Sequence, residues 1–407
     1  MAQESSPMAM RQVKTVADVD LSGKRVLVRV DFNVPIAEEK VTDDTRIRAA
    51  LPTIEFLLNR SAKVILMSHL GRPNGQKNLK YTLRPVAQTL SSLLRRPVLF
   101  LDDCIGQKVL ETIDELDEGS VVLLENLRFY GQEEANDAKF AAQLAKYGDA
   151  YVDDAFGTAH RAHASTVAVP KLLPIRVAGF LLAKELEFLG AKTSHPERPF
   201  VVVLGGAKVS DKIAVIDALL DRCDSMIIGG AMAYTFKLAL GESVGKSLVE
   251  PDRVNDARRA LQKAQEKNVK LLLPVDTLCS DGLNVEKRTI GATQIVDKDI
   301  PDGWEGVDIG PKTVRLFGKA IAAAKTILWN GPVGVFEIPE SARGTYAIAK
   351  FVAESKAVSI VGGGDSISAL NSSGYAKDIT FISTGGGASL EFLEGKELPG
   401  VMALQVK

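Results

Sequence analysis

Cysteine, histidine and tryptophan are scarce in this sequence of 407 residues. It contains three cysteines (Cys104, Cys223 and Cys279), four histidines and two tryptophans. Three cysteines so far apart exclude a disulfide scaffold, and no CxxC or Cys/His cluster indicates a zinc site. A reducing compartment, the cytoplasm, is therefore the location that we expect for the protein.

A large net charge and a long apolar run are also missing. The 50 Lys and Arg residues balance 51 Asp and Glu residues, which excludes a generally basic nucleic-acid-binding protein. The most apolar region, residues 167–182, is interrupted by two prolines, a lysine and an arginine, so we expect no membrane-spanning helix. The first ten residues lack the basic start and apolar core of a secretory signal.

Short runs rich in Val, Ile and Leu alternate with helical patterns along the whole chain. The strands predicted from these runs lie at 26–32, 63–68, 121–125 and 150–156, and then at 200–205, 225–230, 270–276, 326–330, 358–362 and 380–384. Such apolar runs are typical of parallel strands that are buried on both faces. The alternation predicts an α/β protein with two doubly wound parallel sheets, similar to the Rossmann fold.

The boundary between the two domains is expected near residue 190. Leu182, Leu186 and Leu189 lie at helical spacing, and residues 193–199 contain two prolines that would stop a helix. We therefore predict an N-terminal domain over residues 1–185, a helical connector or hinge over 186–199, and a C-terminal domain that begins at residue 200.

Arginines follow the predicted strands of the first half. Arg72, Arg128 and Arg161 each lie shortly after a strand, and Arg46 opens the helical pattern behind the first one. Ligands of open α/β sheets bind beyond the carboxyl ends of the strands. A single arginine is more often a surface charge, but four at corresponding strand ends favour a site for a small molecule with several negative charges.

Glycine-rich loops follow the strands of the second half, at 205–212, 228–236, 329–337, 362–366 and 383–389. Glycine lets backbone N–H groups approach phosphate oxygens, although one such loop also suits a tight strand–helix turn. Lys208 and Lys212 add positive charge, and the carboxylate of Asp365 could hold Mg²⁺ bound to phosphates. Together these loops favour a nucleotide site.

Two familiar nucleotide-binding motifs are not matched. GESVGKS (241–247) has one residue too few between its glycines for a G-x4-G-K-[ST] loop, and it follows a helical pattern. GGGDSIS (362–368) lacks the third glycine of G-x-G-x-x-G, so a nicotinamide-dependent dehydrogenase loses its main support. His160 and His163 have a spacing possible for metal ligands, but no acidic or cysteine partner completes a set.

The motifs VLVRVDFNVP, SHLGRP, ENLRF, DAFGTAHRAHAST, GGAKVSDK, WNGPVGVFE, GGGDS and STGGGAS occur in this order over nearly the whole chain. This combination resembles phosphoglycerate kinase. The resemblance implies a two-lobed monomer whose N-terminal lobe binds 3-phosphoglycerate or 1,3-bisphosphoglycerate. Its C-terminal lobe, residues 200–387, would bind Mg²⁺ with ADP or ATP, while residues from about 388 to 407 pack back on the first lobe. The implied partners are these small molecules, without nucleic acid or membrane.

The same resemblance implies the functional residues. Arg46, Lys208 and Gly386 would be catalytic, and Asp365 would be the protein's ligand to Mg²⁺. The implied substrate-binding residues are Asp31, Phe32, Asn33, Arg46, His69, Leu70, Gly71, Arg72, Arg128 and Arg161. The implied nucleotide-binding residues are Gly206, Ala207, Lys212, Gly230, Val307, Asn330, Glu337, Gly362, Gly363, Gly364, Asp365 and Ser366.

The chemistry of this reaction agrees with the composition of the site. A carboxylate that accepts a phosphoryl group is already ionised, so the site needs positioning and charge neutralisation rather than a general base. One alternative is a two-lobed anion-binding protein without catalysis, which would not need Lys208 or the glycine loops.

Overall fold

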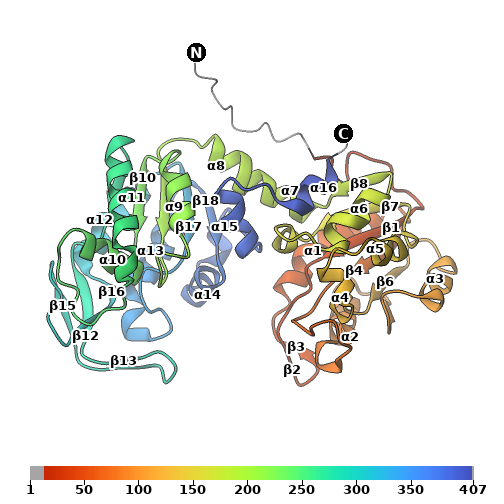
Figure 1. Ribbon diagram of the computed structural model, residues 1–407, viewed down its shortest axis with the longest axis horizontal. Helices are drawn as coiled ribbons and strands as arrows, with labels where there is room; N and C mark the ends of the chain where they lie inside the picture. Colours follow the sequence, from red (N-terminus) through yellow and green to blue (C-terminus); the bar gives the residue numbers. More distant parts are fainter. Residues whose placement is uncertain (1–12, 406–407) are drawn as a thin grey trace, which may run out of the picture. The chain divides into compact units, whose positions relative to one another are not determined.

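The computed structural model describes residues 13–405, which divide into two compact units (Figure 1). Unit 1 comprises the chain up to Leu186 together with the segment that begins at Glu397, and unit 2 comprises Glu187–Lys396. Each unit is built around a six-stranded parallel sheet. No helix in the described part of the chain is both long and apolar enough to cross a membrane.

The sheet of unit 1 has the strand order β5-β6-β4-β1-β7-β8. Its strands are β1 (Arg25–Val30), β4 (Lys63–Met67), β5 (Leu99–Leu101), β6 (Val121–Leu124), β7 (Ala150–Asp154) and β8 (Ile175–Ala178). The chain starts at β1, builds towards one edge and then returns to β7 on the other side of β1. The crevice beyond the carboxyl ends of β1 and β7 is therefore the topological switch point, where open α/β sheets bind ligands.

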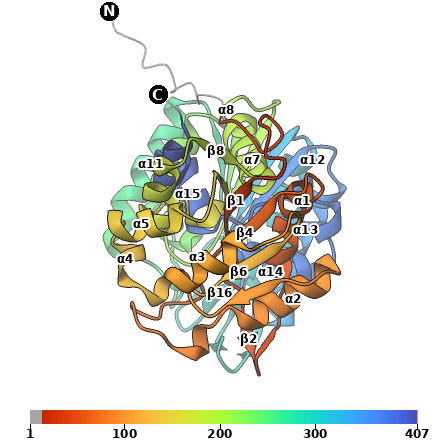
Figure 2. The same ribbon diagram turned by 90° about the vertical axis from the view of Figure 1, so that its right-hand side faces the viewer.

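Helices cover both faces of this sheet, as Figure 2 shows, with α1 (Thr45–Leu58) and α2 (Arg84–Leu94) on one side and α5 (Ala138–Ala145) on the other. Alternate residues of β1 (Val26, Val28 and Val30) enter the same apolar cluster as the buried face of α1. Because side chains alternate along a strand, Arg29 points to the opposite face. This alternation places a guanidinium group inside the unit.

The sheet of unit 2 has the strand order β11-β10-β9-β17-β18-β19. Its strands are β9 (Phe200–Leu204), β10 (Ser225–Ile228), β11 (Lys270–Leu272), β17 (Thr326–Asn330), β18 (Val358–Gly362) and β19 (Phe381–Ile382). Taken in chain order this is the 3-2-1-4-5-6 arrangement of doubly wound nucleotide-binding sheets, with its switch point between β9 and β17.

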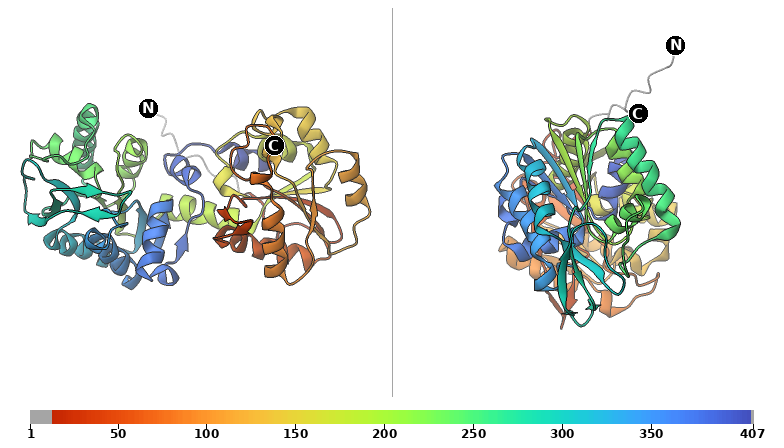
Figure 3. Two further views of the ribbon diagram at one scale, coloured as in Figure 1. Left: turned by 90° about the horizontal axis from the view of Figure 1, so that it is seen from below. Right: turned by 90° about the vertical axis from the view of Figure 1, so that its left-hand side faces the viewer.

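Two layers of helices enclose the unit 2 sheet, as the right-hand view of Figure 3 shows. On one face, α12 (Pro311–Ala322) and α13 (Arg343–Glu354) pack against Trp329 and other alternate strand residues. The other face carries α9 (Ile213–Leu220), α10 (Met232–Ala239) and α11 (Val254–Glu266), and α11 contacts both of the others.

All ten strands expected from the sequence occur in the two sheets, but the sequence patterns missed several shorter elements. β5 has only three residues, and β8 carries Arg176 among its four. A separate antiparallel sheet, β15-β12-β16, is formed by β12 (Thr277–Ser280), β15 (Thr293–Val296) and β16 (Glu305–Ile309). Its strands lack an apolar run. β12 reads TLCS and β16 reads EGVDI, with polar or glycine residues among mostly buried positions, and β15 alternates between exposed and partly buried residues.

Three consecutive helical segments span the end of the predicted N-terminal domain and the first part of the predicted connector, residues 186–199. These are α7 (Phe180–Glu185), a π-helical stretch over Leu186–Ala191 and α8 (Lys192–Ser194), and the apolar residues at helical spacing within them are buried. The boundary between the units falls at residue 186.

The C-terminal segment returns to unit 1 later than the sequence suggested. α15 (Gly387–Leu393) belongs to unit 2, where it contacts α9, and the return begins at Glu397 rather than near residue 388. α16 (Pro399–Leu404) then packs against β8 and α6 (Val169–Leu172) of unit 1.

Candidate functional site

In unit 1, the loop after β1 and the first turn of α1 place an arginine beside a carboxylate. Arg46 Nη1 donates hydrogen bonds to Asp31 Oδ2 at 2.9 Å and to the carbonyl oxygen of Asn33 at 3.3 Å. The side chain of Asp31 is 10% exposed and that of Arg46 is 35% exposed. The contact orients the guanidinium, whose remaining N–H groups can bind an anion.

The loops after β1 and β4 are tied to each other. Asn33 Oδ1 accepts a hydrogen bond from the backbone N–H of Gly71 at 2.9 Å, and Ser68 Oγ accepts one from the N–H of Phe32, also at 2.9 Å. The ring of Phe32 is buried in the apolar core, so it anchors the loop rather than reaching a ligand. Leu70 is likewise buried, and its carbonyl oxygen accepts a hydrogen bond from Asn126 Nδ2.

Arg128 comes from the loop after β6 and is almost completely buried. Its Nη1 donates to the carbonyl oxygen of Gly71 at 2.8 Å, and its Nε lies 3.4 Å from Glu134 Oε1. Arg161, after β7, donates from Nε to His160 Nε2 at 3.2 Å. Arg72 is exposed.

The cluster is strongly electropositive, as its two buried histidines show. Burial, followed by the charges of Arg29, Arg128 and Arg46, lowers the pKa of His69 well below its usual value. Burial and neighbouring arginines lower the pKa of His163 to about 4. Both imidazoles are therefore neutral near pH 7. The fold brings Arg46, Arg128, Arg161 and His69 into one basic cluster suited to a ligand with several negative charges.

In unit 2, the glycines at the β9–β17 switch point allow backbone segments to approach closely. Gly206 and Gly230 have φ angles of +114° and +68°, which favour glycine. A Cβ atom on Gly230 would lie 2.5 Å from the carbonyl oxygen of Gly206. The N–H of Gly206 donates to the carbonyl oxygen of Pro332 at 3.0 Å, which joins the loop after β9 to that after β17.

Lys212 lies within these loops and is 9% exposed. Its Nζ donates to the carbonyl oxygen and to Oδ1 of Asn330, both at 2.7 Å. Burial lowers the pKa of Lys212 to about 8, although the nearby carboxylates of Asp365 and Asp211 oppose that change. A phosphate group beside this ammonium group would restore its proton affinity.

The loop after β18 leads directly into α14 (Gly364–Ser373), with Gly362 closing the strand. Gly363 has φ +90° and caps the helix, while Ser366 Oγ accepts a hydrogen bond from the N–H of Gly331. Asp365 is exposed in the first turn of this helix, and Ala207 and Lys208 are exposed in the loop after β9.

Asp365 is not part of an all-protein metal cage. Within residues 13–405, no group of three or more His, Cys, Asp or Glu side chains could hold a metal ion. A single exposed carboxylate does suit Mg²⁺, which usually keeps water and nucleotide phosphate as its other ligands. The donor set therefore fits a metal that is shared with a bound nucleotide.

The remaining predicted residues lie at three further places in unit 2. Val307 is buried in β16, and its carbonyl oxygen accepts a hydrogen bond from the N–H of Val335 at 2.8 Å, which holds the antiparallel sheet against the loop after β17. Glu337 is exposed in the same loop. Gly386 has φ +54° and caps α15.

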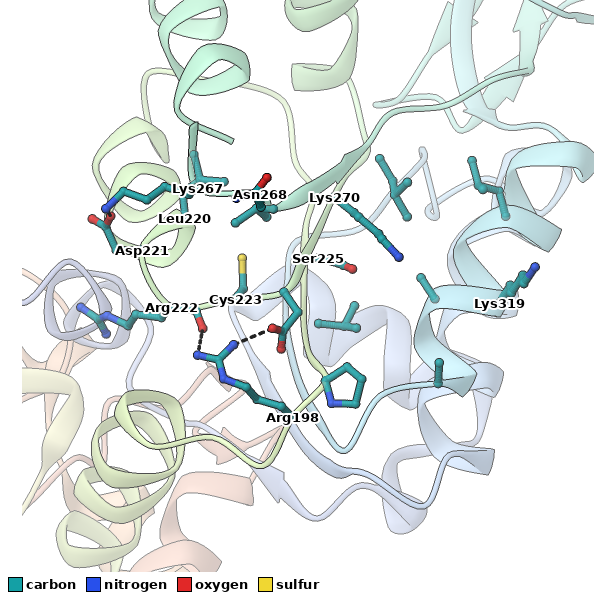
Figure 4. Close-up of a pocket in the computed structure, with 18 residues that line it drawn as sticks. Arg198, Leu220, Asp221, Arg222, Cys223, Ser225, Lys267, Asn268, Lys270 and Lys319 are labelled. Atoms are coloured by element: carbon teal, nitrogen blue, oxygen red, sulfur yellow. Dashed lines mark hydrogen bonds and ion pairs between the residues drawn. The ribbon is translucent and has the colours of Figure 1, made fainter. Parts of the chain in front are cut away.

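A cavity of about 830 Å³ lies at the opposite edge of this sheet and does not involve these loops (Figure 4). Residues that begin β9, β10 and β11 line it, which places it at the amino-terminal ends of the strands. Its acids are already paired, Asp221 with Lys267 at 2.8 Å and Asp224 with Arg198 at 2.6 Å. Burial raises the pKa of the Cys223 thiol to about 12, so this cysteine is not a nucleophile near neutral pH.

Sequence reasoning missed the buried polar residues that hold the basic cluster together. Arg29 lies inside an apolar run that we interpreted only as a strand, yet its Nη2 lies 3.2 Å from His69 Nδ1. A charged residue in the middle of a central strand was the signal available, because such a residue needs a buried partner. Asn126, Glu133 and Ser165 carried no comparable signal.

Comparisons with known proteins agree with this arrangement. Residues 16–396 match the family model described as phosphoglycerate kinase. The phosphoglycerate kinase of Borrelia hermsii is 52% identical over 394 residues, covering 97% of this chain and 99% of that protein. That of Dictyoglomus turgidum is 54% identical over 402 residues, covering 98% of this chain and 100% of the relative.

Solved structures of the same kind resemble the whole chain. The phosphoglycerate kinase structure from Coxiella burnetii has a TM-score of 0.88 and 40% identity, covering 97% of this chain and 98% of its own. The one from Pyrococcus horikoshii has a TM-score of 0.82 and 35% identity, covering 96% and 98%.

Proposed function

The chain belongs to the phosphoglycerate kinase family, and on that premise we propose that it is an ATP:3-phosphoglycerate 1-phosphotransferase. In one direction it transfers the C1 phosphoryl group of 1,3-bisphosphoglycerate to ADP, and in the other it phosphorylates the carboxylate of 3-phosphoglycerate with ATP. One observation carries the proposal. The basic cluster occupies the switch point of the unit 1 sheet, and the glycine loops with the buried Lys212 occupy the switch point of the unit 2 sheet.

Unit 1 would bind the phosphoglycerate. The fork-shaped guanidinium groups of Arg128 and Arg161 suit its phosphate, with the exposed Arg72 beside them. Arg46, oriented by Asp31, would neutralise charge that develops on the transferred group. Asn33 Oδ1 fixes the loop that contains Gly71 and so shapes the site.

Unit 2 would bind the nucleotide. The backbone N–H groups of the loops after β9 and β18 can approach its phosphates, and Lys212 lies where a phosphate would find a partly dehydrated ammonium group. Lys208 is exposed and has a long flexible stem, which suits a lysine that follows the phosphoryl group during transfer. Gly386 would let the start of α15 contribute backbone N–H groups.

The reaction needs no general base. A carboxylate oxygen of 3-phosphoglycerate attacks the γ-phosphorus of ATP, the bond from phosphorus to the β–γ bridging oxygen breaks, and ADP leaves with that electron pair. The side chains therefore have to position the reactants in line and neutralise charge. Mg²⁺, held by Asp365 together with the phosphates, would supply part of that neutralisation when bound.

A hinge motion at the helical connector would bring the two ligands together. Each ligand alone would bind mainly to one unit, so neither alone would favour closure strongly, whereas both together would. Small-angle scattering would show a smaller radius of gyration with both ligands than with either one. A radius that stays constant while turnover is measured would contradict a closing motion.

A coupled assay tests the activity itself. With 3-phosphoglycerate and Mg-ATP, we expect formation of ADP that depends on 3-phosphoglycerate and is greatly reduced in Lys208→Ala. Lys319→Met, which removes an exposed lysine of α12 from the same unit, should leave the rate unchanged. A folded protein that binds both ligands without turnover would instead support the non-catalytic anion-binding alternative.

A further inference from the structure

Arg29 is a fully buried arginine that none of the assigned substrate contacts includes. Its Nε donates to Ser165 Oγ at 2.9 Å, its Nη1 donates to the carbonyl oxygen of Val30, and its Nη2 lies 3.2 Å from His69 Nδ1. A guanidinium group taken out of water is costly unless its donors are satisfied and its charge is compensated. The neighbours of Arg29 must therefore supply hydrogen-bond acceptors for its N–H groups and a negative charge to compensate its own.

The contact with His69 determines which ring nitrogen carries the proton. A guanidinium group has only donors, so Nδ1 of His69 has to offer a lone pair. A neutral imidazole has one protonated nitrogen, which then is Nε2. Burial and the surrounding arginines keep the ring neutral by lowering its pKa. His69 consequently has one donor, Nε2–H, available for a ligand.

The other side of Arg29 is held by a buried acid. Glu133 is 0% exposed and accepts hydrogen bonds from Ser165 through both the backbone N–H, at 2.9 Å, and the hydroxyl group, at 2.5 Å. Because the hydroxyl donates its hydrogen to Glu133, its oxygen is free to accept from Arg29. The direction of every bond from Glu133 through Ser165 and Arg29 to His69 is thereby set.

We propose that Arg29, held by Glu133 through Ser165, is a positioning residue that fixes His69 as the Nε2–H tautomer, so that His69 donates a hydrogen bond to an anionic oxygen of the phosphoglycerate. The proposal rests on the proposed function for the identity of that ligand. The tautomer is independent of it, because all four residues are in contact within unit 1 without a ligand. Arg29 itself acts only through His69.

Nitrogen NMR of imidazole-labelled wild-type protein measures the tautomer directly. The chain has only four histidines, and loss of one pair of signals in His69→Gln assigns the relevant ring. We expect a protonated Nε2 and an unprotonated Nδ1 on His69 from pH 6 to pH 8. A protonated Nδ1, or an imidazolium ring over this range, would overturn the proposal without any variant of Arg29.

Kinetics of matched variants then separate positioning from a structural role. Arg29→Met should raise the KM for 3-phosphoglycerate about tenfold, the cost of roughly one hydrogen bond to a charged group, and leave the KM for ATP unchanged. Arg25→Met is the control, because Arg25 lies in the same strand but pairs with Asp114 and Asp149. Ser165→Ala keeps the guanidinium and should show a smaller change of the same kind, which protects the test if Arg29→Met does not fold.

The outcomes distinguish this proposal from the proposed function. Absence of turnover in the wild-type protein would refute the kinase activity and leave the tautomer measurement valid. Turnover, together with the Nε2–H tautomer of His69 and a rise in the KM for 3-phosphoglycerate alone, supports both the kinase activity and the positioning role of Arg29. A third outcome is that the wild-type protein turns over, but Arg29→Met and Ser165→Ala have the same His69 tautomer and the same two KM values as Arg25→Met. That outcome would refute only the positioning role of Arg29.

Discussion

Nucleotide binding should take up a proton through Lys212 at mildly alkaline pH. Burial lowers the pKa of Lys212 to about 8, although Asp365 and Asp211 oppose that change, and its Nζ donates hydrogen bonds to the neutral oxygens of Asn330. A nucleotide phosphate placed beside it would favour the charged form and raise the pKa again. Near pH 8, therefore, a protein with about half of its Lys212 groups charged should become fully charged on binding.

The pKa of about 8 for Lys212 sets how strongly nucleotide affinity should depend on pH. If the charged form alone binds phosphate well, the affinity for Mg-ADP should fall about tenfold between pH 7 and pH 9, or about 1.4 kcal/mol. At pH 8 about half a proton should be taken up for each nucleotide bound. At pH 6.5, where Lys212 is already charged, the uptake should vanish.

Isothermal titration calorimetry in two buffers of different ionisation enthalpy measures the proton uptake. Lys212→Met should abolish the uptake and weaken binding at pH 7, whereas Lys319→Met should behave like the wild-type protein. An uptake that is absent at pH 8 in the wild-type protein, or that persists in Lys212→Met, would refute the reasoning that links the buried ammonium group to phosphate.

Three further substitutions test other parts of the site. Arg46→Lys should lower kcat by about 10²–10³ because an ammonium group replaces an oriented fork, and steady-state rates within twofold of wild type would remove the catalytic role. Asp365→Asn should shift the Mg²⁺ dependence of nucleotide use to higher concentration, and an unchanged Mg²⁺ titration would place the metal elsewhere. Gly230→Ala should destabilise unit 2 by more than about 1 kcal/mol, because φ is +68° and the new Cβ would clash with the carbonyl oxygen of Gly206. Gly282→Ala, where a Cβ meets nothing within 4 Å, is the control in thermal unfolding, and equal melting temperatures would contradict the argument.

The central strands were predictable because burial on both faces leaves a continuous apolar run in the sequence. β17 reads TILWN and is buried throughout, whereas β15 reads TQIV and alternates between exposed and partly buried residues. β15 therefore lacks the continuous apolar run by which the ten predicted strands were recognised. The start of the C-terminal return lies at Glu397 rather than near residue 388, and nothing in the sequence of residues 388–396 distinguishes packing on one unit from packing on the other.

The candidate site was predictable to the extent that its residues follow strands. Arg46, in the first turn of α1, and Arg128, in the loop after β6, lie at the carboxyl edge of the sheet, where topology alone brings distant segments together. Arg29 could not be assigned in this way, because its role depends on which face of β1 it occupies and on Ser165, which lies 136 positions away. Hydrogen-bond direction and burial of this kind appear only once the fold is known.

The return of the chain to unit 1 at Glu397 has a consequence for synthesis on the ribosome. Gly400 packs against Ala159, with its N–H donating to the Ala159 carbonyl oxygen at 2.9 Å, and Val401 and Leu404 are buried in the same unit. Translation proceeds from the N-terminus, so unit 1 emerges first but lacks α16 until unit 2 has been made. A nascent chain stopped before residue 397 would expose the apolar surface that α16 covers. Unit 1 is thus the first to begin folding and the last to be completed.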